Sequence, residues 1–301
     1  MPARVLSILR RPVVWGVVAL VVVLLLHNAW SRLTRPWGAQ AVDFRPAAET
    51  CGASGALRYC IYRAAQGTNG DVLYHLHGRS LDERIWNDDT YLTGMLQAQW
   101  QGRGALPPTV VTLSYGSTWL LAPRGQRPES GLLEDLMARL PDIEARTGAP
   151  RRRLLMGESM GGLNVLIAGL SEPRTFNKIA ALCPGVYVDS PFDPLTTMRA
   201  AIERTGANPK MAFGIWLLVR TYIADEAEWR RISPLSLIER AGPDTPALYI
   251  SNGLYDAYGN YEGTRLLAER AVERGVRTEW RPLYGGHCAT DIASLASFLV
   301  D

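Results

Sequence analysis

A serine flanked by glycines lies near the middle of the chain, in the sequence GESMGG at residues 157–162. This segment follows an apolar run at 152–156 and precedes a helix-like pattern at 160–170. In a G-x-S-x-G turn the serine sits on a strained connection between a strand and a helix, where the glycines let neighbouring backbone approach closely. N–H groups at the helix start can then stabilise an oxyanion. The pattern predicts that Ser159 is a nucleophile.

His287 is the candidate base for this serine. Of the four histidines, His27 lies in an apolar N-terminal segment, and His75 and His77 precede the serine. Enzymes built around this turn keep the chain order serine, acid, histidine. His287 is the histidine that follows Ser159, and its glycine neighbours suit a loop that reaches across strand ends.

Asp256 is the candidate acid that holds and orients the imidazole. It lies between the serine and the histidine and follows an apolar run at 247–251, as a group at the end of a strand should. Asp244 precedes that run, Asp225 falls in a long insertion, and Asp291 follows the histidine by only four residues. We therefore predict Asp256 as the third member of the triad.

The predicted oxyanion hole consists of two backbone N–H groups, from Met160 and Arg79. Met160 follows the nucleophile, and Arg79 follows an early strand that ends in a flexible His-Gly pair. His75 and His77 also raise a metal hypothesis, because alternate residues of a strand share a face. The metallo-hydrolase pattern H-x-H-x-D-H requires Asp and His where this chain has Arg79 and Ser80. We therefore predict neither a metal nor another cofactor.

Short apolar runs alternate with helix-like patterns through most of the chain, which predicts a mostly parallel sheet with helices on both faces. A long insertion, residues 189–245, carries helical signals of its own and is a candidate helical cap over the site. The predicted strands are 57–63, 72–76, 109–113, 152–156, 178–182, 247–251 and 278–283, and the predicted helices are 129–146, 160–170, 262–274 and 289–299.

Together these pieces resemble the α/β-hydrolase superfamily, and within it the esterase group that contains esterase D (S-formylglutathione hydrolase), feruloyl esterases and mycobacterial mycolyltransferases. The resemblance implies the α/β-hydrolase fold, the triad Ser159, Asp256 and His287, and an ester or thioester substrate. Mycolyltransferases generally lack the second glycine that Gly162 supplies, and cytosolic esterase D proteins lack a membrane anchor. The matching segments are LYHLHG (73–78), the region of Trp86, GESMGG (157–162), ALYISNGLYD (247–256) and GGHC (285–288).

The N-terminal segment 13–26 contains only apolar residues and glycine, with arginines on both sides. As a helix it spans about 21 Å, and about 27 Å when extended to Trp30, against roughly 30 Å for a hydrocarbon core. Two hypotheses remain open: an uncleaved signal anchor, with a transmembrane helix and an extracytoplasmic catalytic domain, and a secretory signal that is cleaved. We expect residues 1–40 to be anchor and stalk, the stalk-like composition running on to residue 56, and residues 41–301 to form one catalytic domain.

The charge distribution argues against a nucleic-acid partner. The chain of 301 residues has a formal net charge of +3, but residues 1–40 hold five arginines and no acidic residue. The remainder carries 27 basic and 29 acidic residues, so the catalytic body is slightly acidic. Basic residues that flank an apolar segment are explained by membrane topology.

Four cysteines are compatible with export. Cys51 and Cys60 are nine residues apart with glycines between them, which suits a small disulfide-closed loop. Cys183 and Cys288 are distant in sequence, yet both are expected near the active site. For that second pair, a disulfide and two free buried thiols are both open.

These observations predict an exported, membrane-anchored serine esterase that acts through an acyl-enzyme on a small-molecule, lipid or glycan ester. One alternative is a cell-envelope acyltransferase of the mycolyltransferase kind, in which an acceptor alcohol replaces water. Another is a catalytically silent domain that binds the cell envelope.

Overall fold

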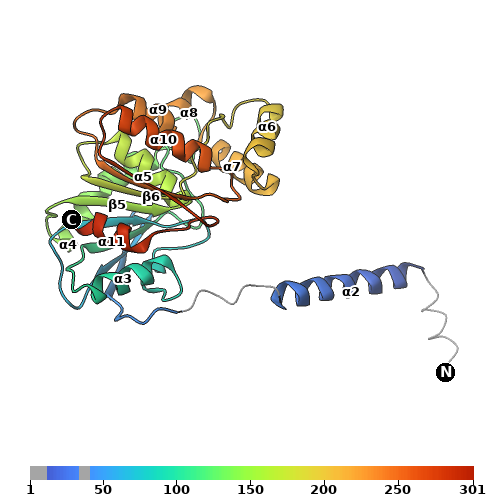
Figure 1. The fold of residues 1–301 in the computed structure, drawn as a ribbon, viewed down its shortest axis with the longest axis horizontal. Coiled ribbons are helices and arrows are strands. Elements are labelled where there is room, and N and C mark those ends of the chain that lie inside the picture. The colour runs from blue at the N-terminus through green and yellow to red at the C-terminus, as the bar shows by residue number, and fades with distance from the viewer. Residues whose placement is uncertain (1–11, 34–40) are drawn as a thin grey trace. The chain divides into compact units, whose positions relative to one another are not determined.

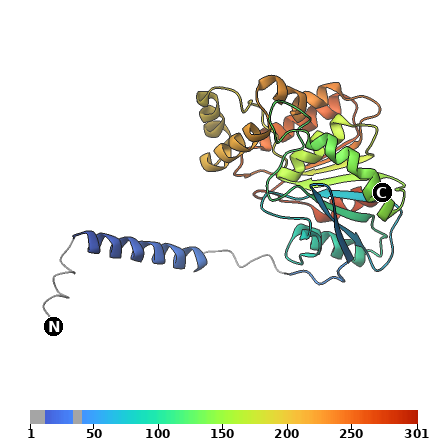
Figure 2. The same ribbon diagram turned by 180° about the vertical axis from the view of Figure 1, so that it is seen from behind.

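The computed structural model describes residues 12–33 and 41–301 (Figures 1 and 2). The chain divides into two units, Met1–Ala41 and Val42–Asp301. In the first unit, helix α2 covers Pro12–Leu33. The predicted basic flank at residues 10–11 and the part of the predicted stalk at 34–40 lie outside the described residues.

The predicted transmembrane helix is not supported. No helix within residues 12–33 or 41–301 is long and apolar enough to cross a membrane. Within α2, the continuous apolar stretch ends at Leu26 and is followed by His27 and Asn28. That stretch corresponds to only about 21 Å of helix.

The second unit is built on a sheet of eight strands in the order β1-β2-β4-β3-β5-β6-β7-β8. The pairs β1–β2 and β2–β4 are antiparallel, and every other neighbouring pair is parallel. A mostly parallel central sheet was predicted. The strands are β1 Ala48–Ser54, β2 Leu57–Arg63, β3 Val72–Leu76, β4 Thr109–Ser114, β5 Arg153–Glu158, β6 Lys178–Leu182, β7 Ala247–Gly253 and β8 Thr278–Leu283.

Strand β1 corrects the sequence prediction, which assigned residues 31–56 to a stalk. Ala48–Ser54 forms the edge of the sheet, and its side chains are mostly exposed. An exposed edge strand lacks the alternation of buried and exposed apolar residues by which strands are recognised in sequence. Cys51 lies directly opposite Cys60 across the β1–β2 pair, so their disulfide joins two paired strands of a hairpin and not the ends of an irregular loop.

Helices cover both faces of the sheet (Figure 1), and successive residues of β3 show how each face is filled. Tyr74 packs on one face, together with Val72 and Leu76, in a core that includes residues of α4, α5, α8, α9 and α10. Leu73 packs in the other core, with η1, α3 and α11. The helices on these faces are η1 Ile85–Asn87, α3 Leu92–Gly102, α4 Leu132–Thr147, α5 Met160–Ser171, α8 Glu226–Ile232, α9 Pro234–Leu237, η2 Ile238–Arg240, α10 Tyr261–Glu273 and α11 Ile292–Val300.

The insertion between β6 and β7 is helical, as its sequence predicts. Its first two helices are α6 Leu195–Thr205 and α7 Pro209–Tyr222, which stand together at one side of the domain in Figure 1. Helix α6 buries none of its residues fully, whereas α7 buries Leu218, Val219 and Tyr222. The insertion thus joins the core through α7, α8 and α9 and leaves α6 on the outside.

The topology gathers several strand ends at one edge. Strand β3 pairs with β4 on one side and with β5, which comes later in the chain, on the other. Sites in sheets of this kind form at the carboxyl ends of the strands, near the point where the strand order reverses. The carboxyl ends of β3, β5, β7 and β8 lead directly into the segments that carry Arg79, Ser159, Asp256 and His287.

Candidate active site

Ser159 occupies a strained turn between β5 and α5. Its φ of 55° and ψ of −113° lie outside the regions that ordinary side-chain-bearing residues favour. The Ser159 N–H donates to the carbonyl of Leu182 at 2.9 Å, which fixes the turn to the neighbouring strand. Ser159 remains partly exposed in this turn, whereas its neighbours Glu158 and Met160 are buried.

The glycines of the turn are required by close backbone approach. A Cβ atom on Gly161 would overlap the carbonyl oxygen of Leu76, and one on Gly157 would overlap the carbonyl of Gly161. A Cβ on Gly162 would also lie too close to the carbonyl oxygen of Leu182. The first helical turn of α5 can therefore lie against the ends of β3 and β6 only if these positions carry no side chain.

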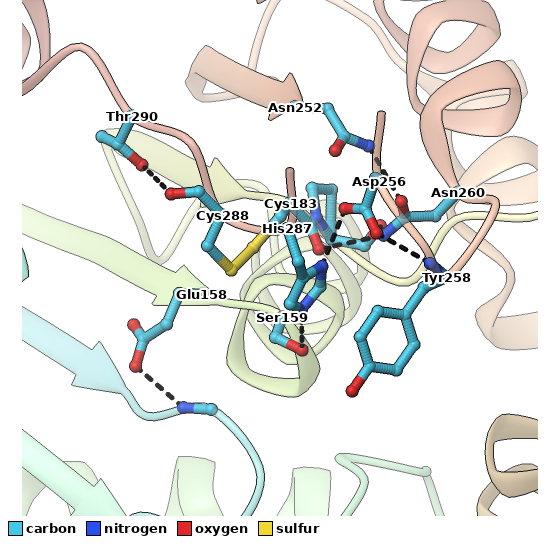
Figure 3. Close-up of a disulfide and its surroundings, with 12 residues drawn as sticks. Glu158, Ser159, Cys183, Asn252, Asp256, Tyr258, Asn260, His287, Cys288 and Thr290 are labelled. Atoms are coloured by element: carbon cyan, nitrogen blue, oxygen red, sulfur yellow. Dashed lines mark hydrogen bonds and ion pairs between the residues drawn. A yellow bond between two sulfur atoms is a disulfide. The ribbon is translucent and has the colours of Figure 1, made fainter. Parts of the chain in front are cut away.

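His287 connects Ser159 to Asp256 through two hydrogen bonds (Figure 3). Its Nδ1 lies 2.7 Å from Oδ2 of Asp256, and its Nε2 lies 2.9 Å from Oγ of Ser159. An ionised carboxylate can only accept, so Nδ1 carries the proton and Nε2 of the neutral ring is free to accept the serine proton. This is the arrangement that a general base needs.

The acid is fixed more tightly than the base. The Asp256 side chain is fully buried, and its second oxygen accepts the Tyr258 N–H at 2.9 Å. The loops that carry acid and base also lie against each other, because the Tyr255 N–H donates to the Gly285 carbonyl at 3.0 Å. A Cβ on Gly253 would overlap that same carbonyl. The Asp256 carboxylate is thus held in one orientation before any substrate arrives.

A disulfide ties down the residue after the base. Cys288 bonds to Cys183, which directly follows β6, and their Cα atoms are 4.8 Å apart (Figure 3). Both cysteines have positive φ, 42° for Cys183 and 59° for Cys288. The Cys183 N–H in turn donates to the Ser251 carbonyl of β7 at 2.7 Å. The loop that carries His287 is therefore joined covalently to the centre of the sheet.

Among the residues that the structure describes, neither of the two N–H groups predicted to form an oxyanion hole has a hydrogen-bond partner. Met160 is the first residue of α5, so its N–H has no carbonyl to bond within the helix. The neighbours of Arg79 are bonded: the Gly78 N–H reaches Oε1 of Glu158 at 2.8 Å and the Ser80 N–H reaches the Ser117 carbonyl at 2.8 Å. Between them, the Arg79 N–H has no hydrogen-bond partner anywhere in residues 12–33 and 41–301.

The ring nitrogens of His75 and His77 are engaged with protein groups. His75 contacts Thr112 Oγ1 at 3.2 Å and Glu158 Oε2 at 2.8 Å, and both partners are buried. His77 contacts the Gly78 carbonyl at 2.8 Å and Ser114 Oγ at 2.9 Å. Burial lowers the pKa of His77, which keeps its ring neutral. These histidines support the sheet and the loop after β3.

Potential metal ligands come together twice in the part of the chain that the structure describes, once at Cys183, His287 and Cys288 and once around Cys51 and Cys60. In both groups the cysteines are joined as disulfides. A metal binds the thiolate of cysteine, and a disulfide offers none.

Two residues of the site went unnoticed in the sequence. Tyr258 packs its ring against that of His287, with the ring centres 4.2 Å apart (Figure 3). Glu158, next to the nucleophile, is almost fully buried and binds the loop after β3. An acidic residue at the end of the otherwise apolar run 154–157 is an unusual feature and could have directed attention to Glu158.

A small apolar cavity of about 90 Å³ lies beside the site, under the helices of the insertion. Tyr258 belongs to its wall and also packs against His287. The other side chains that define its apolar character are Met198 and Ile202 of α6, Ile215 and Trp216 of α7, and Trp229 of α8.

Residues 58–291 match the model of the Esterase family, whose description reads "Putative esterase". The chain belongs to this family. The match covers most of the catalytic unit and includes the strand ends that carry Ser159, Asp256 and His287. The resemblance to α/β-hydrolase esterases that the motifs indicated is confirmed. Among proteins with curated descriptions, none matches the chain.

Solved structures confirm the fold of this esterase-family chain as that of the α/β hydrolases. One similar structure is an arylesterase, with 19% identity, a TM-score of 0.59 and coverage of 87% of this chain and 85% of the other. A ferulic acid esterase has 17% identity and a TM-score of 0.57 over 85% and 96% of the two chains. An esterase from Pyrobaculum calidifontis has 17% identity and a TM-score of 0.59 over 87% and 86%.

Proposed function

We propose that this protein is a serine esterase in which Ser159, His287 and Asp256 form the catalytic triad. One observation carries the proposal: the hydrogen-bonded chain from the Ser159 hydroxyl through His287 to the buried Asp256, built on a strained turn at the start of a helix. Family membership supports a carboxylic ester hydrolase, and the geometry supports the serine mechanism.

The proposed reaction proceeds through an acyl-enzyme. Ser159 Oγ attacks the ester carbonyl while its proton passes to Nε2 of His287, and Asp256 stabilises the imidazolium. The oxyanion accepts hydrogen bonds from the N–H groups of Met160 and Arg79. His287 then gives the proton to the departing alcohol oxygen. Water, deprotonated by His287, then attacks the acyl-enzyme, and His287 returns this proton to Ser159 Oγ as the acid is released.

The apolar cavity under α6 and α7 supports a substrate with an apolar group of limited size. Its volume of about 90 Å³ is smaller than the ~150 Å³ cavity that accommodates benzene in an engineered protein. Tyr258 forms part of the cavity wall and also packs against His287, so the cavity lies one side chain away from the proposed base. We therefore expect small-molecule esters with short apolar groups to be the preferred substrates.

We further propose that the catalytic unit is exported. Its support is the pairing of all four cysteines in disulfides, Cys51 with Cys60 and Cys183 with Cys288. Disulfides persist in oxidising compartments outside the cytosol. A thiol count on the denatured protein, isolated from its own cells with thiols blocked, tests this proposal. We expect no free thiol, and four free thiols would contradict export.

The enzymatic proposal is tested with nitrophenyl esters of rising acyl length and the purified full chain. Wild type should hydrolyse the short esters, and Ser159→Ala should abolish turnover. Ser171→Ala, at the far end of the same helix, is the matched control and should retain wild-type rates. Activity left in Ser159→Ala would overturn the nucleophile, and no wild-type turnover of any ester or thioester would overturn the esterase. Added acceptor alcohols and glycans distinguish hydrolysis from acyl transfer through the products formed.

A further inference from the structure

Glu158 is a buried acid immediately before the proposed nucleophile. Only 1% of its side chain is exposed, at the carboxyl end of β5. Burying a carboxylate is costly unless its oxygens are hydrogen-bonded. Such a residue beside a reacting group therefore needs an explanation from its contacts.

Three donors surround this carboxylate. Oε2 lies 2.8 Å from Nε2 of His75, and Oε1 accepts the Gly78 N–H at 2.8 Å and the Tyr91 hydroxyl at 3.1 Å. His75 is itself fully buried and has Thr112 Oγ1 at its other nitrogen, 3.2 Å away. Burial and the neighbouring carboxylate together raise the pKa of Tyr91, so its hydroxyl keeps its proton. The carboxylate is thus bonded to β3, to the loop after β3 and to the start of α3.

One of these bonds reaches the proposed oxyanion hole. The Gly78 N–H that Glu158 binds belongs to the residue before Arg79, and the Ser80 N–H on the other side is bound to Ser117. Ser80 has a φ of 68°, so the loop adopts a conformation that an unrestrained chain would seldom hold. Holding the two neighbouring N–H groups leaves the one of Arg79 free and fixes its direction.

We propose that Glu158 is a positioning residue that fixes the geometry of the oxyanion hole. Its backbone leads through Ser159 to the first donor, the Met160 N–H, and its side chain holds the loop of the second donor. One residue thereby sets the distance between the two donors. This inference rests on the proposed esterase function of Ser159.

The expected magnitude follows from what one oxyanion donor contributes. Removing a single donor typically lowers kcat by about 10²–10³-fold. Glu158→Ala should therefore lower kcat on nitrophenyl acetate by about 10²-fold and change KM by less than about threefold, since the interaction strengthens only in the transition state. The affinity of a trifluoromethyl ketone, which forms a tetrahedral adduct with the serine, should fall by a similar factor.

Glu158→Gln distinguishes hydrogen bonding from charge. Its amide oxygen can accept from Gly78 and Tyr91, and its NH₂ group can donate to His75, whose proton then moves to the nitrogen facing Thr112. We expect this variant to recover most of the activity.

Glu144 offers a matched control, because it also accepts a tyrosine hydroxyl, that of Tyr74 at 2.7 Å, and lies away from the triad on α4. Glu144→Ala should lower the stability but leave kcat and inhibitor affinity unchanged. If Glu158→Ala does not fold, Glu158→Asp, whose side chain is one methylene shorter, takes its place with the same expected loss.

The outcomes separate the two proposals. Wild-type protein that neither hydrolyses esters nor reacts with a fluorophosphonate at Ser159 would overturn the esterase function itself. An active wild type with a folded Glu158→Ala, or Glu158→Asp in its place, of unchanged kcat and inhibitor affinity would overturn the positioning role alone. Equal losses of kcat in the Glu158 and Glu144 variants would also overturn it, since they would reflect stability only.

Discussion

Replacing Asp256 by asparagine should invert the proton arrangement of the proposed triad. One oxygen of Asp256 accepts the Tyr258 N–H at 2.9 Å and the other accepts Nδ1–H of His287 at 2.7 Å. In the Asp256→Asn variant the backbone N–H of Tyr258 still requires an acceptor, so the amide oxygen stays there and the NH₂ group faces His287. Nδ1 must then accept, the ring proton moves to Nε2, and Nε2 can no longer take the proton of Ser159.

The size of the effect follows from the two ways in which the variant can respond. Keeping the productive tautomer would set two donors against each other, at a cost of about 1–3 kcal/mol for each unpaired buried group. The imidazolium formed in the transition state would also lose its counter-charge. The corresponding change in a serine protease lowers kcat by about 10⁴-fold, which is roughly 5.5 kcal/mol. We expect a loss of the same order here.

The assay is kcat on nitrophenyl acetate for wild type and Asp256→Asn, with folding checked by urea unfolding. Asp291→Asn is the matched control. Asp291 lies near His287 in sequence and caps α11 by accepting the Ala293 and Ser294 N–H groups, a role that asparagine also fills. The control should stay within about threefold of wild type. If Asp256→Asn kept more than about a tenth of the wild-type kcat, the tautomer argument and the assignment of the acid would both be wrong.

Three further predictions concern the turn around Ser159, the second disulfide and a buried lysine. Gly161→Ala should cost more than about 4 kcal/mol in urea unfolding, because its Cβ would overlap backbone, whereas Gly102→Ala, which meets no neighbour, should be tolerated. A wild-type-like Gly161→Ala would contradict the close backbone approach at this turn. Replacing Cys183 and Cys288 by serine opens a loop of 105 residues and should lower the free energy of unfolding by about 4–5 kcal/mol. It should also lower kcat, because the loop that carries His287 becomes freer to move. An unchanged free energy of unfolding would argue against this disulfide. Burial lowers the pKa of Lys178 from its ordinary value of 10.5 to about 8 in the folded protein. Between about pH 8 and pH 10.5, the unfolded chain therefore binds a proton at this lysine that the folded protein has released. Wild-type stability should therefore gain from Lys178 as the pH rises through this window, and Lys178→Met should be most stabilising below pH 8; a pH-independent difference would refute this.

Much of the sheet was predictable from local pattern. Strands β2, β3 and β6 cover the predicted residues, because runs buried on one or both faces read directly as apolar segments. Strand β8 also has its predicted bounds, although none of its residues is buried. Strand β1 was missed, since an exposed edge strand has no such pattern. The predicted transmembrane helix is not supported, since no helix in residues 12–33 or 41–301 is long and apolar enough to cross a membrane.

The site divides in the same way. The nucleophile turn has a local signature, since its glycines are required by close backbone approach within a few residues of Ser159. Asp256 is predictable from the chain order serine, acid, histidine and from its position just after a predicted strand. Glu158 and Tyr258 were not recognised, because what they do depends on contacts with residues that are distant in the sequence or on a neighbouring loop.

The sequence by itself determined the family, the strand-turn-helix around Ser159 and the candidates for base and acid, because each depends on neighbouring residues or on their order in the chain. The tertiary structure decided which groups meet: it placed His287 between Ser159 and Asp256, joined Cys183 to Cys288 and set Glu158 against Gly78. The physical reason is that hydrogen bonds and disulfides act over a few ångströms. Only the pairing of the strands brings together residues that are about 80 to 130 positions apart in the chain.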